Sequence, residues 1–203
     1  MASGVPSFKL ILVGEYGVGK SSIFRRFLDN SFTTETGPRS TIGLDHFGKV
    51  FSIGEKSIKL ELWDTAGIER FATLAASYFQ GATAALLCYS INNRESFNIL
   101  AHHILDIVMH SETAKIFLCG SKLDLNEEQV TEQDIQDFIV QCDAVLSGTY
   151  RISSKTNEGV QDMFKDIAAK LITDAKERSD STTIRPGESS SIGPQQSQKC
   201  CSK

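Results

Sequence analysis

The sequence predicts an α/β fold, with a mostly parallel six-stranded sheet, one antiparallel edge strand and helices on both faces. Short apolar runs alternate with helical stripes along residues 8–178, and this alternation is typical of a parallel sheet covered on both sides. Two neighbouring apolar runs flank a short polar turn, which predicts one antiparallel hairpin. The length of 203 residues allows one such domain and a remainder.

The expected strands are short apolar runs that end at glycine or polar residues. In chain order they are Phe8–Val13, Phe47–Ile53, Ile58–Trp63, Ala82–Ser90, Lys115–Gly120 and Thr149–Ile152. Gly-Glu-Lys-Ser separates the second run from the third and predicts the hairpin turn.

Helices are expected where apolar residues recur at three- and four-residue spacing. The first should begin at Gly19, directly after a glycine-rich turn. The later stripes consist of Phe97, Leu100, Ile104 and Val108; of Ile135, Phe138, Ile139 and Cys142; and of Val160, Met163, Phe164, Ile167, Ala168 and Leu171. We expect these stripes to form the core and not to hold a cofactor.

The composition changes after Arg178, which divides the chain into a domain at 8–178 and a tail at 179–203. The tail holds seven serines and two of the four prolines, and its aliphatic residues are Ile184 and Ile192. Such a segment buries too little apolar area to offset its ordering entropy, so we expect disorder. No window approaches the roughly 18 apolar residues that span a bilayer, and the first residues predict no signal peptide.

The charge balance and the cysteines narrow the class of protein. The chain carries 21 basic and 25 acidic residues, a net charge of −4, which argues against nucleic acid as a partner. Five cysteines at spacings that fit no metal site predict a reducing cytosol. Cys88, Cys119 and Cys142 lie in apolar stretches and should pack as small hydrophobic residues. Cys200 and Cys201 are adjacent near the C-terminus.

A phosphate-binding motif follows the first expected strand. Residues 14–21, Gly-Glu-Tyr-Gly-Val-Gly-Lys-Ser, match G-x-x-x-x-G-K-[ST]. The glycines let backbone N–H groups approach phosphate oxygens, and the N-terminus of the next helix adds a positive dipole. Lys20 would bring a charge to the terminal phosphates, and Ser21 would bring a hydroxyl to Mg²⁺.

Further segments resemble the signatures of Ras-like small GTPases, and of the Rab branch in particular. Residues 63–71 (WDTAGIERF) resemble WDTAGQERF, and residues 41–45 (TIGLD) resemble T-I-G-V-D. Residues 121–124 (SKLD) resemble N-K-x-D, and residues 153–155 (SSK) resemble S-A-K. The segments occur in the family's order. With the final CCSK, similar to C-C-x-x prenylation ends, they imply a P-loop G domain and a lipid-anchored tail.

The resemblance implies a site for GTP or GDP with Mg²⁺. For the phosphates it implies Gly17, Val18, Gly19, Lys20, Ser21 and Ser22. For Mg²⁺ it implies Ser21 and Thr41 as ligands and Asp64 through a water, and for hydrolysis Lys20, Thr41 and Gly67. For the guanine base it implies Ser121, Lys122, Asp124, Ser153, Ser154 and Lys155. Asp124 would accept the base N1–H and exocyclic amine, a donor pair that adenine lacks, which disfavours an ATP-using enzyme.

Three departures from the family pattern concern the nucleotide. Ile68 replaces the glutamine that orients the attacking water, and Tyr16 replaces a small P-loop residue where an arginine finger would enter. Both predict slow hydrolysis, although neutral change with compensation is a second interpretation. Ser121 replaces the asparagine that ties the base to the P loop, which predicts a loosened base site.

The resemblance also implies an effector-binding face made of Ile42, Gly43, His46, Trp63 and Tyr78. His46 stands where Rabs carry phenylalanine, so the aromatic triad it would form with Trp63 and Tyr78 is more polar. The remaining histidines, His102, His103 and His110, have no acidic or cysteine partner at ligand spacing. We therefore assign them no function.

Two functions remain open. The first is a Rab-type switch in vesicle trafficking, with exchange factors, activating proteins, effectors, a GDP-dissociation inhibitor and prenylation enzymes as partners. Prenylation of Cys200 and Cys201 would place it on the cytoplasmic face of an intracellular membrane, with a cytosolic pool and a monomeric G domain. The second is a platform that hardly hydrolyses GTP and stays bound to it.

Overall fold

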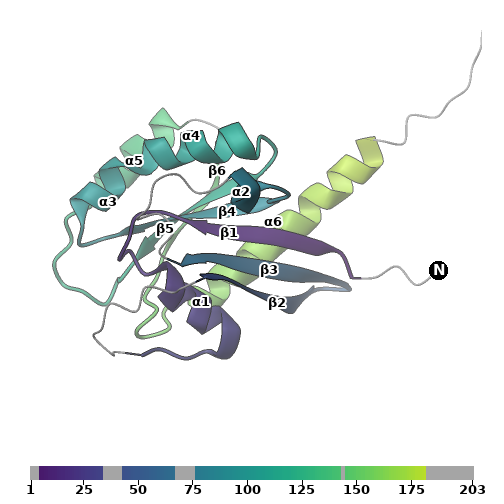
Figure 1. Ribbon diagram of the computed structural model, residues 1–203, viewed down its shortest axis with the longest axis horizontal. Helices are drawn as coiled ribbons and strands as arrows, with labels where there is room; N and C mark the ends of the chain where they lie inside the picture. Colours follow the sequence, from purple (N-terminus) through teal and green to yellow (C-terminus); the bar gives the residue numbers. More distant parts are fainter. Residues whose placement is uncertain (1–4, 34–42, 67–75, 143–144, 182–203) are drawn as a thin grey trace, which may run out of the picture.

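The computed structural model describes residues 5–33, 43–66, 76–142 and 145–181. Within them a six-stranded sheet has the order β2-β3-β1-β4-β5-β6 (Figure 1). Only the β2–β3 pair of the described strands is antiparallel, and β2 lies at the edge. The expected sheet is confirmed.

The strands follow one another as the sequence predicts, with differences at their ends, whereas α2 was not predicted and α3 and α4 replace one expected helix. The strands are β1 Ser7–Val13, β2 Gly43–Ile53, β3 Lys56–Ala66, β4 Ala84–Ser90, β5 Lys115–Ser121 and β6 Leu146–Arg151. The helices are α1 Lys20–Asp29, α2 Ala76–Phe79, α3 Arg94–Asn98, α4 Leu100–His110, α5 Glu132–Gln141 and α6 Val160–Ser181.

Alternating side chains of β1 build two cores, one on each face of the sheet. Leu10 and Leu12 belong to the core covered by α1 and α6, whereas Ile11 and Val13 belong to the core covered by α2 to α5. All four are fully buried, as expected when helices cover both faces of a central strand (Figure 1).

The hairpin turn is shorter than the sequence predicts. Ile53 pairs with Lys56, so only Gly54 and Glu55 connect β2 to β3. Gly54 has φ +61, the left-handed conformation that two-residue hairpin turns require. Lys56 and Ser57, which we expected in the turn, therefore belong to β3.

The stripe expected around Val108 is wrong by one position. A break at Ile99 separates α3 from α4, and the buried face of α4 then runs through Leu100, His103 and Ile107. Val108 lies on the outer side and is 44% exposed. The periodicity does not reveal the break, because Ile99 and Leu100 are both apolar and neither glycine nor proline marks the position.

The boundary between domain and tail also differs from the prediction. Helix α6 continues to Ser181, so residues 179–181 are helical where we expected disorder. The change of composition does not end the helix, because the first proline beyond it is Pro186. Residues 182–203 lie outside the described residues. None of the described helices is both long and apolar enough to cross a membrane.

Phe27 of α1 provides a test of the larger core. Its ring is 1% exposed and packs 4.7 Å from the ring of Phe164 in α6. Phe27→Ala should lower the free energy of unfolding by about 3–4 kcal/mol, because it leaves a cavity between α1, α6 and the sheet. Urea denaturation of the GDP-loaded protein measures the change. The neighbouring Leu28→Ala, at a side chain 38% exposed, should cost under about 1 kcal/mol, and equal losses would contradict this packing.

Candidate functional site

The predicted motifs meet at the carboxyl ends of the parallel strands. The P loop follows β1, Ser121 ends β5, and Ser153 and Ser154 follow β6. In a parallel sheet these ends lie along one edge, where α/β proteins bind their ligands. The topology thus brings together segments that lie more than 100 residues apart in the sequence.

The P loop passes against the backbone of β4. A Cβ atom on Gly14 would lie 2.2 Å from the carbonyl oxygen of Cys88, and Gly14 has φ +140. Gly17 and Gly19 also have positive φ, +78 and +102. Gly19 is the N-cap of α1 and provides no side-chain hydrogen bond. The first backbone N–H groups of a helix that is capped in this way can bind an anion.

Lys20 is held inside this loop. Its side chain is 5% exposed, and Nζ donates hydrogen bonds to the carbonyl oxygens of Gly14 at 2.6 Å and Glu15 at 2.8 Å. These bonds fix the position of the ammonium group at the start of α1. The ammonium group lies beside a loop in which three glycines have positive φ. This arrangement fits the predicted role of Lys20 in binding the terminal phosphates.

A cavity of about 320 Å³ adjoins the P loop. Its walls contain most of the residues predicted to bind the base and two residues that the sequence analysis did not single out, Phe32 and Leu125. The lining residues are Gly19, Ser22, Phe32, Ser121, Lys122, Asp124, Leu125, Ser154 and Lys155. Phe32 was missed because it belongs to none of the motifs from which the base site was predicted. Its position just beyond α1 was the available signal.

Asp124 is oriented by the segment that follows β6. The Ser153 hydroxyl donates to Oδ1 of Asp124 at 2.6 Å, and Nζ of Lys155 lies 3.7 Å from Oδ2. Ser154 Oγ is buried and has no hydrogen-bond partner among the described residues. Burial lowers the pKa of Lys122, although Asp124 opposes this shift. An oriented carboxylate and an unsatisfied hydroxyl fit a base that carries both donors and acceptors.

Arg26 of α1 holds the same segment in place. Its Nε donates to the carbonyl oxygen of Ser154 at 2.6 Å, and its Nη2 donates to that of Lys155 at 2.8 Å. The helix that begins at the P loop therefore also fixes the loop after β6. No local pattern predicts this role, because the partners of Arg26 are 128 and 129 residues away.

Ser121 contacts the P loop despite its short side chain. Its hydroxyl lies within hydrogen-bond distance of the carbonyl oxygens of Val18 and Tyr89, the latter at 2.9 Å. Serine at this position therefore still links the base site to the P loop, and the expected loosening of that site stays a prediction. Faster nucleotide release stays a prediction.

The residues predicted for Mg²⁺ are only partly described. Ser21 lies in the first turn of α1, and Asp64 of β3 is 1% exposed. A hydroxyl and a carboxylate are oxygen donors that suit Mg²⁺. Thr41, Gly67 and Ile68, together with Ile42 of the predicted effector face, lie outside the described residues.

Of the three aromatic residues expected on the effector face, two lie against each other and the third is buried, and their role in effector binding stays a prediction. The rings of His46 and Trp63 stack with centroids 4.6 Å apart, and Nζ of Lys9 lies 4.5 Å from the centre of the Trp63 ring. Tyr78, by contrast, is 6% exposed, and its hydroxyl donates to the carbonyl oxygen of Trp63 at 2.8 Å. Tyr78 is a core residue because backbone groups satisfy its hydroxyl. Gly43 begins β2.

His102 and His103 have acidic partners that we did not expect. Nε2 of His103 lies 3.1 Å from Oε1 of Glu15 in the P loop, and Nε2 of His102 lies 3.8 Å from Asp106 on the same helix. His103 is buried in the face of α4 that packs on the sheet. Its partner precedes it by 88 residues, so no local pattern predicts the contact.

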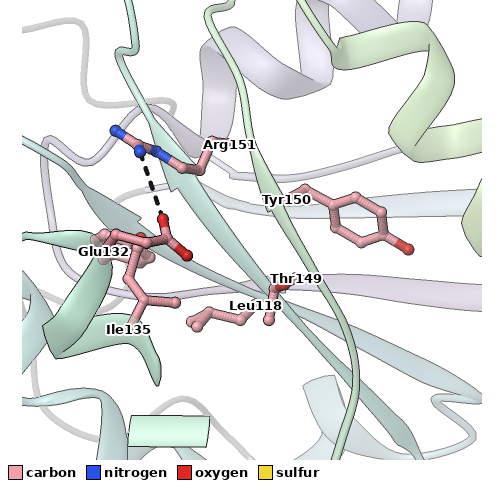
Figure 2. Close-up of a pocket in the computed structure, with 7 residues that line it drawn as sticks. Leu118, Glu132, Ile135, Thr149, Tyr150 and Arg151 are labelled. Carbon is pink, nitrogen blue, oxygen red and sulfur yellow. Dashed lines mark ion pairs between the residues drawn. The ribbon is translucent and has the colours of Figure 1, made fainter. Parts of the chain in front are cut away.

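A second cavity, of about 190 Å³, lies between β5, β6 and α5. Figure 2 shows the guanidinium of Arg151 beside the carboxylate of Glu132, with Nη1 and Oε2 3.6 Å apart, and Leu118 and Ile135 nearby. None of the residues predicted to bind nucleotide lines this cavity. The first cavity is therefore the candidate nucleotide site.

Comparison with known proteins agrees with this geometry. The model of the Ras family matches residues 9–173. The chain is a Rab-like member of the Ras family of small GTPases. It is 36% identical to Ras-related protein Rab-10 of Caenorhabditis elegans over 193 residues, which cover 92% of this chain and 94% of that protein. It is 35% identical to human Ras-related protein Rab-30 over 190 residues, 91% of each chain.

A further relative, Ras-related protein Rab-4A of Rattus norvegicus, is 35% identical over 167 residues, 81% of this chain and 74% of that protein. Ras-family proteins are GTPases that bind GTP and GDP, typically with Mg²⁺. Membership therefore accounts for a P loop and a base-site cavity that meet at one edge of the sheet.

Arg26→Ala should release the loop that orients Asp124. We expect GDP to dissociate up to roughly thirty-fold faster, because two hydrogen bonds, each contributing about 1 kcal/mol, are lost. Release of a fluorescent GDP analogue into excess GDP gives the rate. Arg25→Ala is the matched control. The hydrogen bond described for Arg25 joins its Nη1 to the exposed hydroxyl of Thr33 and does not involve the loop after β6. A rate equal to that of the control would contradict the role of Arg26.

Proposed function

We propose that the chain is a Rab-type molecular switch that binds GTP or GDP with Mg²⁺ and recruits effectors in intracellular membrane trafficking. The observation that carries this proposal is the continuous site formed by the P loop, Lys20 and the cavity around Asp124. The Rab-named relatives support the trafficking role.

Different residues would bind the phosphates and Mg²⁺. Gly17 to Ser22 would hold the phosphates, with Lys20 as the cation, while Ser21, Thr41 and Asp64 would hold Mg²⁺. Mg²⁺ would neutralise charge that develops between the β- and γ-phosphates during hydrolysis. Backbone amides and Lys20 would stabilise the same charge without moving, because the loop already fixes them.

Discrimination for guanine would rest on Asp124, supported by Ser153 and Lys155. Ser121, Lys122 and Ser154 would complete the walls around the base. In the switch proposal, the segments around 33–47 and 65–80 would adopt different arrangements with GTP and with GDP. Exchange factors, activating proteins and effectors would then recognise those arrangements, including the surface at His46 and Trp63.

Extraction of the nucleotide from the purified protein tests the proposal directly. Chromatography of the denatured sample should yield GDP or GTP in about equimolar amount to the protein, and no adenine nucleotide. Binding of ATP in preference to GTP, or no nucleotide binding in the presence of Mg²⁺, would contradict the proposal.

A second candidate function is a platform that stays bound to GTP and hardly hydrolyses it. Tyr16 favours it, because this P-loop side chain is 45% exposed and stands where an activating protein would insert an arginine. Ile68 favours it as well, since its side chain cannot hydrogen-bond to water. Single-turnover release of phosphate separates this function from the switch.

Ile68→Gln combined with Tyr16→Gly should accelerate intrinsic hydrolysis. The glutamine restores a group that can orient water, and we expect roughly ten-fold, which corresponds to about 1.4 kcal/mol of the activation barrier. Phosphate release from GTP-loaded protein measures the rate. Ile68→Leu with Tyr16→Gly is the control for side-chain size and should stay slow. Equal rates in both double variants would show that water positioning does not limit hydrolysis.

Prenylation of Cys200 and Cys201 would anchor the protein to the membrane. Two lipid chains give stable anchoring, whereas one gives marginal binding. The tail carries three basic residues and two acidic residues, Arg185, Lys199 and Lys203 against Asp180 and Glu188, a net of +1. This charge adds little attraction to an anionic surface, so anchoring should need both thiols. A GDP-dissociation inhibitor would supply the cytosolic pool.

The variant with Cys200→Ser and Cys201→Ser should become cytosolic and keep its affinity for nucleotide, and either single change should weaken membrane residence. Fractionation of cells that express each variant measures this distribution. Cys142→Ser, a change at a thiol that packs against the core, is the matched control and should distribute like the parent. A double variant that still pellets with membranes would exclude these thiols as the anchor.

A further inference from the structure

The contact between His103 and Glu15 joins α4 to the P loop. His103 lies in the face of α4 that packs on the sheet and is 9% exposed. Its Nε2 lies 3.1 Å from the carboxylate of Glu15. A buried imidazole needs a hydrogen-bond partner, and the P loop supplies it from across the sheet edge.

Glu15 connects this histidine to the phosphate-binding lysine. Its backbone carbonyl accepts a hydrogen bond from Nζ of Lys20 at 2.8 Å, while its side chain contacts His103. Glu15 therefore contacts both residues, Lys20 through its carbonyl oxygen and His103 through its carboxylate. Movement of its side chain would tilt the peptide that anchors Lys20.

We propose that His103 is a positioning residue of the nucleotide site, which holds Glu15 so that the carbonyl of Glu15 can fix Lys20. This inference rests on the proposed function, because the ligand whose release it controls is the guanine nucleotide. His103 does not contact that ligand itself. Its effect passes through the hydrogen bond to Glu15.

The charged groups around His103 set the direction of a pH response. Burial lowers the pKa of His103, and Lys20 lowers it too, whereas Glu15 and Asp106 raise it. The ring of His102, 6.3 Å away, is the other titratable group beside it among the described residues. The net effect lowers the pKa of His103, mainly through burial, so the neutral ring is favoured. Once protonated, it forms a charge-assisted bond to Glu15 and adds positive charge near the phosphates.

The experiment measures release of a fluorescent GDP analogue from the full chain with Mg²⁺ at pH 7.5 and at pH 5.8. At pH 7.5, His103→Ala should release it roughly five- to ten-fold faster than the parent, the effect of one hydrogen bond to a charged group. His103→Gln should restore most of the slow release, because its amide can donate to Glu15. The parent should release more slowly as His103 gains its proton on acidification, and His103→Gln should lack this pH response.

His102→Gln is the matched control, since it removes a histidine from the same helix that does not contact the P loop. It should keep both the rate and the pH response of the parent. Melting temperatures of the GDP-loaded variants check that each is folded, and Glu15→Gln serves as a second test of the pair if His103→Ala does not fold. Glu15→Gln keeps a hydrogen-bond acceptor but should abolish the pH response.

Two results would overturn the inference. The first is a GDP release rate of His103→Ala that equals the rate of the parent at both pH values. If His103→Ala does not fold, the same result for Glu15→Gln counts in its place. The other is a pH response in His103→Gln equal to that of the parent. Both presuppose that the parent retains GDP, and a parent that retains none would contradict the proposed function instead.

Discussion

The close approach of the P loop to the backbone of β4 is the constraint on which the candidate site depends. Gly14 lies so near the carbonyl of Cys88 that a side chain would need that strand to move. Because the loop lies directly against the strand, its own carbonyl oxygens face inward and hold Lys20. The position of the cation thus follows from a backbone contact that only glycine permits.

Helix α1 extends this constraint to the rest of the cavity. It begins at the P loop, and its Arg26 holds the carbonyl groups of Ser154 and Lys155. Ser121 lies against Val18 from the end of β5. The loops from β1, β5 and β6 are therefore linked by hydrogen bonds near the base site. A ligand that contacts one of these loops contacts a connected unit.

The sequence predicted most of the fold because its signals were local. Buried parallel strands appear as apolar runs, and amphipathic helices as stripes, so the sheet and its two covered faces could be predicted. The phosphate and base residues were predicted from short motifs, and the structure places Ser22, Ser121, Lys122, Asp124, Ser154 and Lys155 around one cavity.

The errors arose where tertiary packing decides the outcome. Tyr78 was assigned to the surface by analogy with an aromatic triad, but backbone groups around β1 and β3 satisfy its hydroxyl and bury it. The partner of His103 lies in another element, which spacing along one helix does not reveal. Val108 was misplaced because the break at Ile99 rotates the buried face of α4. The first two errors concern contacts between elements, and the third concerns the division of one expected helix into two.

The geometry of α6 determines how a tethered form of this domain would be oriented. The helix starts directly after the loop that holds Asp124 and ends at Ser181 (Figure 1). At 1.5 Å per residue, its 22 residues span about 33 Å, comparable to the diameter of a small domain. It packs on the sheet along its first turns, and its far end at Ser181 is the point from which residues 182–203 continue. A tether at that end would leave the nucleotide cavity on the opposite side of the domain, open to proteins approaching from solution.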